Sequence, residues 1–249
     1  SPALASTLIV NARIVDGTGA AARNGAVRVD GALITAVGPL KPGNGETVID
    51  AHGQVLAPGF IDTHSHHDRE LDAHPEDAVA VSQGITTIVV GQDGSSEFPL
   101  RDYFAKLTAH PVAVNVASYS GHNTVRDRAM GKDFRREATP AEVKAMAEMV
   151  RQDMADGALG LSSGLEYDPG IYSAKSEVLE LAKAAAESGG RYISHIRSED
   201  VHEWEAIDEI INIGRVTGMP VQVSHMKLAM VDWWGQAAKF TGKLDAARA

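Results

Sequence analysis

Cysteine is absent from the 249 residues, and no stretch approaches the roughly 18 consecutive apolar residues that a membrane-spanning helix needs. The first absence excludes disulfides and thiolate metal sites, so any metal must be held by histidine and carboxylate. Residues 1–6 lack the basic start and apolar centre of a signal peptide, although a leader that had already been removed would leave no trace. We therefore expect a soluble protein, and these absences do not decide between cytoplasm and periplasm.

Basic residues are in the minority, with 23 Lys and Arg against 33 Asp and Glu and a formal net charge of -10. This balance argues against binding to nucleic acid or to an anionic membrane surface. Hydrophobic residues make up 44% of the chain, which is enough for a substantial core. We expect a folded protein whose partners are small molecules, and the oligomeric state stays open.

The pattern of the chain changes near residue 53. Residues 1–52 contain short β-rich runs, "TLIVNARIVDG" and "GAVRVDGALITAVG", with Asp16-Gly17 and Asp30-Gly31 as turn signals. Residues 53–249 contain apolar β-rich runs that alternate with helical stretches, which is typical of parallel βα units. We predict a small β domain over 1–52 and a barrel of βα units over 53–249.

Six apolar runs predict the strands of that barrel: "VLAPGFIDTH", "TTIVVGQDG", "VAVNVASYSGH", "GALGLSSGLEY", "RYISHIRSE" and "PVQVSHMK". Helices are predicted after a capping box at residues 139–142, over "SEVLELAKAAAESGG" and over "EWEAIDEIINIGRVTG". The alternation favours an α/β fold, a (β/α)8 TIM-type barrel. Such a barrel takes about 250 residues. Because only six strands follow residue 53, we expect an incomplete polypeptide whose remainder is missing.

Histidines stand at the carboxyl ends of several predicted strands. His64, His66, His195 and His225 end three strands, and His122 ends a fourth. Active sites of parallel barrels form at that face, so these imidazoles are expected to converge. His64 and His66 are two residues apart and therefore point to the same side of their strand.

A carboxylate joins this set, because Asp93 in "VVGQDG" ends the second strand. Zinc binds imidazole and carboxylate at about 2.0–2.2 Å, and a catalytic site keeps one position open for water. We predict one or two Zn²⁺ ions, or another divalent metal. The predicted ligands are His64, His66, Asp93, His195 and His225.

Plainer interpretations exist for each residue taken alone. A single strand-end histidine is usually a hydrogen-bonded surface group, and Asp-Gly is an ordinary turn pair. Asp62 and Asp68 can cap helices or orient a histidine. The coincidence of several histidines at several strand ends favours the metal site.

These residues together resemble the amidohydrolase superfamily of metal-dependent hydrolases, from about residue 7 to the end of the chain. The marker is "PGFIDTHSHHD", which carries the family's His-x-His. Within the superfamily the chain is most similar to the D-aminoacylase group, the N-acyl-D-amino-acid deacylases. The segments that carry this likeness are "QGITTIVVGQDG", "YSGHNTVR", "GALGLSSGLEYDPG", "YISHIRSED" and "VQVSHMK". The resemblance implies a (β/α)8 barrel and a small β-sandwich, to which residues 1–52 would contribute.

The resemblance also implies which residues bind each ion. His64 and His66 would bind one metal, and His195 and His225 the other. Asp93 stands where the group's usual "GNCG" has a bridging cysteine, and a harder ligand can change metal preference or occupancy. The fourth strand lacks the carboxylated lysine of hydantoinase-like members. The family's catalytic aspartate follows the eighth strand and is expected in the missing C-terminal half.

The implied activity is zinc-dependent hydrolysis of the linear amide bond of a small N-acyl-D-amino acid. Tyr192 matches a family tyrosine that hydrogen-bonds the developing oxyanion, or it is a tyrosine packed inside the barrel. Lys227 can bind the substrate carboxylate as a point charge. Arg197 can do the same, or it can pair with Glu199 or Asp200.

Two other functions remain open. The protein can be an amidohydrolase for another C–N bond, in a cyclic amide, a dipeptide or a ring amine, because His-x-His does not set the substrate. It can also be a catalytically silent, truncated relative. Acyl chain, side-chain preference and stereochemistry follow only from the resemblance.

Overall fold

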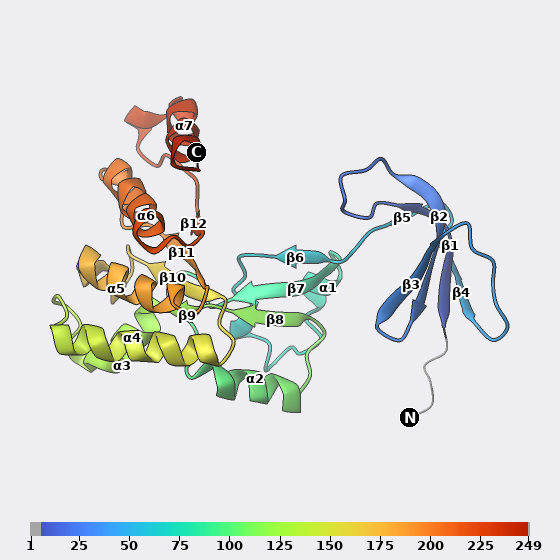
Figure 1. The fold of residues 1–249 in the computed structure, drawn as a ribbon, viewed down its shortest axis with the longest axis horizontal. Coiled ribbons are helices and arrows are strands. Elements are labelled where there is room, and N and C mark those ends of the chain that lie inside the picture. The colour runs from blue at the N-terminus through green and yellow to red at the C-terminus, as the bar shows by residue number, and fades with distance from the viewer. Residues whose placement is uncertain (1–5, 249) are drawn as a thin grey trace. The chain divides into compact units, whose positions relative to one another are not determined.

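A computed structural model of the chain describes residues 6–248 (Figure 1). The chain forms two compact units, Ser1–Phe60 and Ile61–Ala249. Residues 1–5 of the predicted β domain and residue 249 of the predicted barrel lie outside the described residues. Between residues 6 and 248, no helix combines the length and apolar character needed to cross a bilayer.

The first unit is built around one five-stranded sheet in the order β3-β2-β1-β4, with β5 also paired to β1. The strands are β1 (Thr7–Ile14), β2 (Arg23–Asp30), β3 (Leu33–Gly38), β4 (Thr47–Asp50) and β5 (Val55–Leu56). Apolar residues of β1 alternate toward the interior, where Leu8, Ala12 and Ile14 are buried. The turn between β2 and β3 follows the predicted Asp30-Gly31 signal, and Gly31 has the positive φ of 59° that such a turn requires.

The second unit is a succession of parallel strands, each followed by helical or loop structure. Its strands are β6 (Phe60–Asp62), β7 (Ile85–Val90), β8 (Asn115–Ser118), β9 (Ser120–Gly121), β10 (Gly160–Gly164), β11 (Arg191–His195) and β12 (Val221–Val223). Two sheets follow chain order, β6-β7-β8 and β9-β10-β11-β12, and the β7/β8 and β9 to β12 pairs are parallel. Each of the six predicted runs contains a strand. Sequential parallel pairing is the arrangement of a (β/α) barrel, of which this unit forms the first part.

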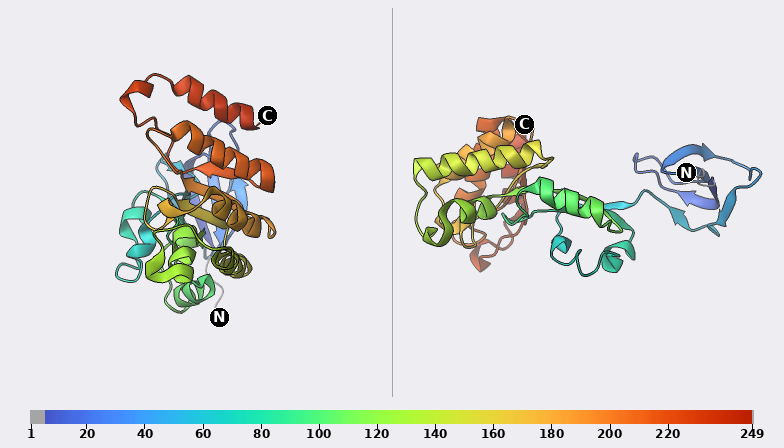
Figure 2. Two further views of the ribbon diagram at one scale, coloured as in Figure 1. Left: turned by 90° about the vertical axis from the view of Figure 1, so that its left-hand side faces the viewer. Right: turned by 90° about the horizontal axis from the view of Figure 1, so that it is seen from below.

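Helices cover this series of strands. They are α1 (Ala78–Val81), α2 (Leu100–Ala109), α3 (His122–Met130), α4 (Pro140–Ala155), α5 (Lys175–Ala186), α6 (Glu203–Thr217) and α7 (Ala237–Arg248). Consecutive helices from α3 to α6 pack side by side, as the further views in Figure 2 show. The predicted capping box is present at the start of α4, where Thr139 accepts from the Glu142 backbone and Glu142 accepts from the Thr139 backbone. The predicted helices α4, α5 and α6 are confirmed.

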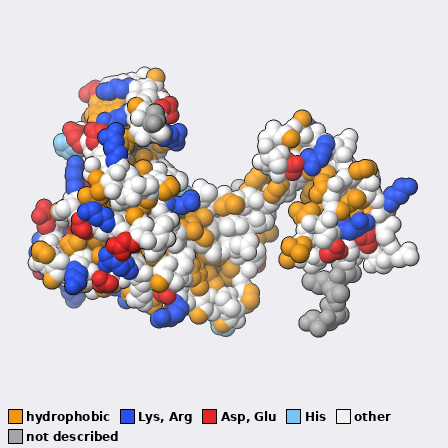
Figure 3. Space-filling model, in the orientation of Figure 1, with side chains coloured by type: hydrophobic (Ala, Val, Ile, Leu, Met, Phe, Trp, Pro, Cys, Tyr) orange, Lys and Arg blue, Asp and Glu red, His pale blue; other side chains and the backbone are white. Residues whose placement is uncertain are grey.

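Charged side chains are mixed by sign over the helices of the second unit. Figure 3 shows Lys and Arg interspersed with Asp and Glu on the face that it presents. Several of them form ion pairs between neighbouring helices, such as Arg151 of α4 with Glu187 after α5, at 2.7 Å. Exposed pairs of this kind contribute about 0–1 kcal/mol each, so the apolar contacts between helices and strands carry most of the stability.

Asp153 is a buried acid that joins three elements of the second unit. It lies in α4 and accepts hydrogen bonds from the Leu100 backbone N–H at the start of α2 (3.1 Å) and from Ser120 Oγ in β9 (2.7 Å). Burial raises the pKa of the Asp153 carboxyl to about 6, because the two hydrogen bonds only partly offset the loss of hydration.

We expect Asp153→Asn to flatten the pH dependence of the free energy of unfolding between 3.8 and about 6. An acid whose pKa is raised in the folded state stabilises that state at low pH, and the contribution is lost as pH rises through the folded-state pKa. Asparagine does not titrate and can still bond Leu100 and Ser120. Urea unfolding at several pH values across this range is the measurement, with the exposed Asp102→Asn as a matched control. An Asp153→Asn variant that keeps the wild-type pH dependence contradicts the assignment.

Candidate metal centre

The predicted ligands come together at the carboxyl ends of the parallel strands. His64 and His66 follow β6, Asp93 follows β7, His195 is the last residue of β11, and His225 follows β12. The ring centroid of His64 lies 5.3 Å from the ring centroid of His66 and 5.3 Å from that of His225. The ring centroids of His195 and His225 are 4.8 Å apart. Residues that are up to 161 positions apart therefore form one cluster of four imidazoles and a carboxylate.

Asp93 lies at the centre of one half of the cluster. Its Oδ2 is 3.3 Å from Nε2 of His64 and 3.2 Å from Nε2 of His66. Burial raises the pKa of the Asp93 carboxyl, but the hydrogen bond from His64 and the charges of the surrounding imidazoles outweigh burial, so its pKa lies below the ordinary value. The carboxyl group is thus held in the anionic form that a metal ligand needs.

The backbone of the Asp93 loop is shaped to present this side chain. Asp93 has φ 51°, a left-handed conformation that aspartate adopts more readily than most residues, and Gly94 follows with φ 81°. A Cβ atom on Gly94 would lie 2.5 Å from Asn123 Oδ1 and 2.8 Å from the Gly164 backbone nitrogen. Glycine at this position therefore allows the loop to pack closely against α3 and the end of β10.

The other half of the cluster is held by glutamates that the sequence analysis did not select. His225 Nδ1 is 3.0 Å from Glu199 Oε1, and His195 Nδ1 is 3.6 Å from the same oxygen. His195 Nε2 is 2.8 Å from Glu166 Oε2. Ligand atoms of His64, Asp93 and His225, and those of His195, Glu199 and His225, each lie within 4.8 Å of one another.

Tyr167 is a further residue of the cluster that the sequence analysis missed. Its hydroxyl is 2.9 Å from His195 Nδ1, and the two rings are 4.4 Å apart. Burial and the negative charges of Asp93, Glu199 and Glu166 raise the pKa of Tyr167, so the phenol remains a hydrogen-bond donor. Its place after β10, in "GLEY", obeys the same strand-end rule that selected the histidines.

Glu199 and Glu203 are two acids that follow His195 closely in sequence, and this closeness to a strand-end histidine could have selected them. Glu199 stands four residues after His195, within the segment "HIRSE", and is buried. Glu203 begins α6 and is buried, and neither of its carboxylate oxygens has a hydrogen-bond partner among residues 6–248. Burial and repulsion from Glu199 and Glu166, partly offset by Lys227, raise the pKa of Glu203 to about 7.

The three predicted catalytic and substrate-binding residues lie in different surroundings. Lys227 contacts Glu199 Oε2 through its ammonium group, and its side chain is 51% exposed. Arg197 forms a two-pronged ion pair with Glu209, at 2.8 and 2.9 Å, instead of pairing with Glu199 or Asp200. The guanidinium of Arg197 is therefore occupied, whereas the ammonium group of Lys227, paired with Glu199, retains donors for a ligand.

Tyr192 is buried in the core among apolar side chains, and its hydroxyl is 2.5 Å from Ser163 Oγ. Among residues 6–248, no hydrogen bond and no ring pair joins Tyr192 to the clustered imidazoles. These surroundings match the alternative interpretation from the sequence, in which Tyr192 is a tyrosine packed inside the barrel. The oxyanion role of Tyr192 stays a prediction.

His122 begins α3 and takes no part in the cluster. It is buried, and its Nε2 is 2.8 Å from Glu177 Oε1 of α5. The same glutamate pairs with the buried Arg126, which also donates to the carbonyl oxygens of Pro169 (3.1 Å) and Phe134 (3.2 Å). This buried network joins α3 and α5 to the loop that carries Tyr167.

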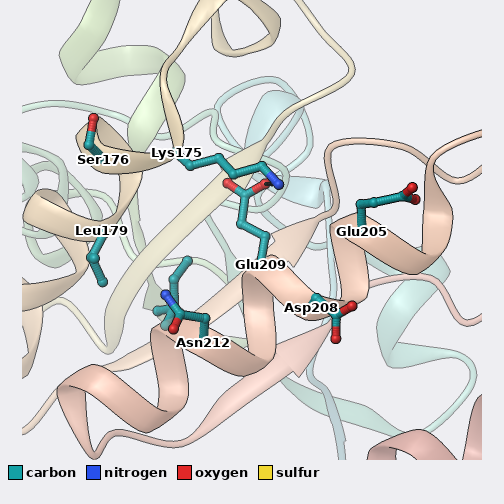
Figure 4. Close-up of a pocket in the computed structure, with 8 residues that line it drawn as sticks. Lys175, Ser176, Leu179, Glu205, Asp208, Glu209 and Asn212 are labelled. Atoms are coloured by element: carbon teal, nitrogen blue, oxygen red, sulfur yellow. Dashed lines mark ion pairs between the residues drawn. The ribbon is translucent and has the colours of Figure 1, made fainter.

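A separate hollow lies between α5 and α6 (Figure 4). Its lining residues are Lys175, Ser176, Leu179, Glu205, Asp208, Glu209, Asn212 and Ile213. Lys175 Nζ lies 4.0 Å from Glu209 Oε2, the carboxylate that also holds Arg197. No predicted metal ligand lines this hollow, so it is distinct from the histidine cluster.

Known proteins share this arrangement of sequence and fold. The amidohydrolase family model matches residues 47–248. An N-acyl-D-aspartate deacylase of Alcaligenes xylosoxydans xylosoxydans is 38% identical over 253 residues, covering 92% of this chain and 51% of that protein. A solved N-acyl-D-glutamate deacylase of Bordetella bronchiseptica, complexed with zinc and a phosphonate mimic of the tetrahedral intermediate, is 36% identical with a TM-score of 0.90. That match covers 97% of this chain and 56% of the other.

A solved D-aminoacylase, studied for the role of its binuclear metal centre, is 34% identical with a TM-score of 0.91, over 97% of this chain and 56% of that one. The chain spans about half the length of the curated relatives that it matches. The family match, in contrast, extends over most of the present chain. The fold, the strand-end histidines and these matches agree: the chain belongs to the amidohydrolase family.

Proposed function

We propose that the protein carrying this chain is a zinc-dependent deacylase that hydrolyses the linear amide bond of N-acyl-D-amino acids. The observation that carries the proposal is the convergence of His64, His66, His195 and His225 around Asp93 at the strand ends. Relatives named as D-aminoacylase and as N-acyl-D-aspartate and N-acyl-D-glutamate deacylases, at 33–38% identity, support the substrate class.

The cluster fits a divalent metal by two independent features. His64 Nδ1 and Asp93 Oδ1 are buried without a hydrogen-bond partner among the described residues. The Asp93 oxygen lies 3.2–3.3 Å from two imidazole nitrogens. Two ligand atoms on a tetrahedral ion with bonds of about 2.0–2.1 Å lie about 3.3 Å apart. The cluster therefore has donor types and spacing that suit zinc.

The residues proposed to hold the metal are His64, His66, Asp93, His195 and His225. One ion or two fit this set, because two groups of possible ligand atoms, those of His64, Asp93 and His225 and those of His195, Glu199 and His225, each lie within 4.8 Å of one another. When bound, zinc supplies a Lewis acid that polarises the amide carbonyl and makes water more acidic. Aspartate in place of a thiolate favours a harder metal than the group's cysteine does.

Tyr167 is proposed to act on the substrate carbonyl. Its phenol lies beside His195 and is protonated at neutral pH, so it can donate a hydrogen bond to the carbonyl oxygen as negative charge develops there. We propose this role for Tyr167 because Tyr192, which the sequence predicts, is enclosed in the core and already bonded to Ser163.

Lys227 is proposed to bind the carboxylate of the N-acyl amino acid. It is half-exposed, stands two residues after His225, and one of its three ammonium donors is directed to Glu199. Arg197 stays a weaker candidate, because Glu209 and the Ser173 carbonyl oxygen (2.8 Å) occupy its guanidinium group.

The activity is tested on the complete protein after reconstitution with zinc. We expect release of free D-amino acids from N-acetyl-D-aspartate, N-acetyl-D-glutamate and N-acetyl-D-leucine, loss of activity after chelation, and recovery on adding zinc. The N-acetyl-L enantiomers and a cyclic amide such as dihydrouracil are the controls. Hydrolysis of the cyclic amide alone would place the protein in the second functional class, and zinc-loaded protein inactive on every substrate would support a silent relative.

A further inference from the structure

Glu199 is held in a fixed position between two strand ends. Its backbone N–H donates to Glu166 Oε1 (2.8 Å), and its carbonyl oxygen accepts from the Ala229 N–H (3.3 Å). The residue itself is only 5% exposed. These contacts anchor Glu199 to the segments that follow β10 and β12, so its carboxylate has little freedom to move.

The Glu199 carboxylate contacts two different functional groups on the segment after β12. Its Oε1 accepts from His225 Nδ1 at 3.0 Å, and its Oε2 is paired with the Lys227 ammonium. The same Oε1 lies 3.6 Å from His195 Nδ1. One buried anion therefore contacts a predicted metal ligand and a predicted substrate-binding residue at the same time.

This contact decides which nitrogen of His225 can bind a metal. A neutral imidazole that donates its Nδ1 proton carries the free lone pair on Nε2. A carboxylate that receives the other ring N–H fixes the orientation of a ligand histidine and makes it more basic. Glu199 is placed to do this for His225.

The contact with Lys227 has a separate consequence. An ammonium group has three donors, and one directed to Glu199 leaves two for a ligand. Long lysine side chains lose considerable rotamer entropy when they are fixed. Because Glu199 already restrains Lys227 in the free protein, less rotamer entropy of Lys227 is lost when the substrate binds.

We propose that Glu199 is a positioning residue that orients His225 toward the metal and holds Lys227 toward the substrate carboxylate. The proposal rests on the proposed function for its second half, whereas its first half concerns metal binding alone. It differs from direct ligation of the metal by Glu199, which the proximity of His195, Glu199 and His225 would also permit.

The test compares Glu199→Gln with Glu199→Asp and with the control Asp200→Asn in the complete protein. Asp200 is the adjacent exposed acid, bonded to Ser198 Oγ, so its replacement removes the same charge without touching the cluster. Zinc affinity is measured by competition with a chromophoric chelator. We expect Glu199→Gln to weaken zinc binding by about 10–100-fold and Glu199→Asp to recover part of the loss. Asp200→Asn should bind zinc as the wild type does.

A spectroscopic measurement separates orientation from ligation. In the Co²⁺-substituted protein, Glu199→Gln should retain the visible absorption spectrum of the wild type at saturating metal, because the ligand set is unchanged. A changed spectrum would assign Glu199 to the ligand set and overturn the positioning role. Zinc affinity equal to that of the wild type in Glu199→Gln would also overturn it. If Glu199→Gln does not fold, as judged by circular dichroism, Glu199→Asp is decisive on the same two measurements.

Steady-state kinetics at saturating zinc test the second half of the proposal, in which Glu199 holds Lys227 toward the substrate carboxylate. We expect Glu199→Gln to raise KM for N-acetyl-D-amino acids severalfold more than it lowers kcat, since Lys227 loses its restraint. An unchanged KM would overturn the coupling to Lys227. A wild-type protein that binds zinc but hydrolyses no N-acyl-D-amino acid would instead refute the proposed function and leave the zinc measurements valid.

Discussion

Asp93→Ala is expected to remove most bound metal and to lower kcat/KM by about 10³-fold or more. Asp93 Oδ2 is the atom that contacts both His64 and His66, and alanine leaves these imidazoles with no anion between them. Metal polarisation of a carbonyl is worth several kcal/mol, and each 1.4 kcal/mol corresponds to about tenfold in rate. Elemental analysis of the purified variant and kinetics on N-acetyl-D-amino acids are the measurements.

Asp93→Cys provides the matched comparison for this experiment. The D-aminoacylase group that the chain resembles carries a cysteine at this place, so a thiolate should retain metal where alanine does not. The metal preference of the Asp93→Cys variant should move toward softer ions than that of the wild type. Wild-type metal content in Asp93→Ala would show that the aspartate is a turn residue and not a ligand.

Tyr167→Phe is expected to lower kcat by about 10²–10³-fold, the effect of removing one donor to a developing oxyanion. Metal content and KM should change little, because the variant loses only a hydroxyl that lies beside His195. The paired variant Tyr192→Phe discriminates between the two tyrosines. If the large fall in kcat follows Tyr192→Phe and spares Tyr167→Phe, the sequence-based assignment is right and our structural one is wrong.

The strands of the barrel could be predicted because their apolar runs are long and bounded by clear turn signals. The helices α4, α5 and α6 have equally plain starts or stops, such as the Thr139 capping box and Gly218 in the left-handed conformation after α6. Helix α2 lacks them: it starts after Pro99 without a side-chain cap, and only Leu100 is buried. Helix α3 starts at His122 directly after β9, so the sequence pattern extends the strand into the helix.

The candidate site shows the same division between regular and irregular structure. The histidines and Asp93 could be selected because strand ends of a parallel barrel face one another, whatever their separation in sequence. Glu199 escaped because its side chain reaches the cluster from the loop after β11, where no periodicity tells which way a residue points. The pairing of Arg197, in the loop after β11, with Glu209 of α6 depends on how the helix folds back beside that loop, which no local pattern specifies.

The buried network around Arg126 has a practical consequence for mutagenesis. One fully buried guanidinium joins the buried Glu177 to the carbonyl oxygens of Pro169 and of the half-buried Phe134. Removing one partner of such a buried pair costs about 3–5 kcal/mol, a large fraction of the roughly 5–15 kcal/mol by which folded domains are stable. In a saturation library scored by activity alone, Arg126 would therefore rank with the metal ligands. Scoring the yield of folded protein in parallel would separate the two groups.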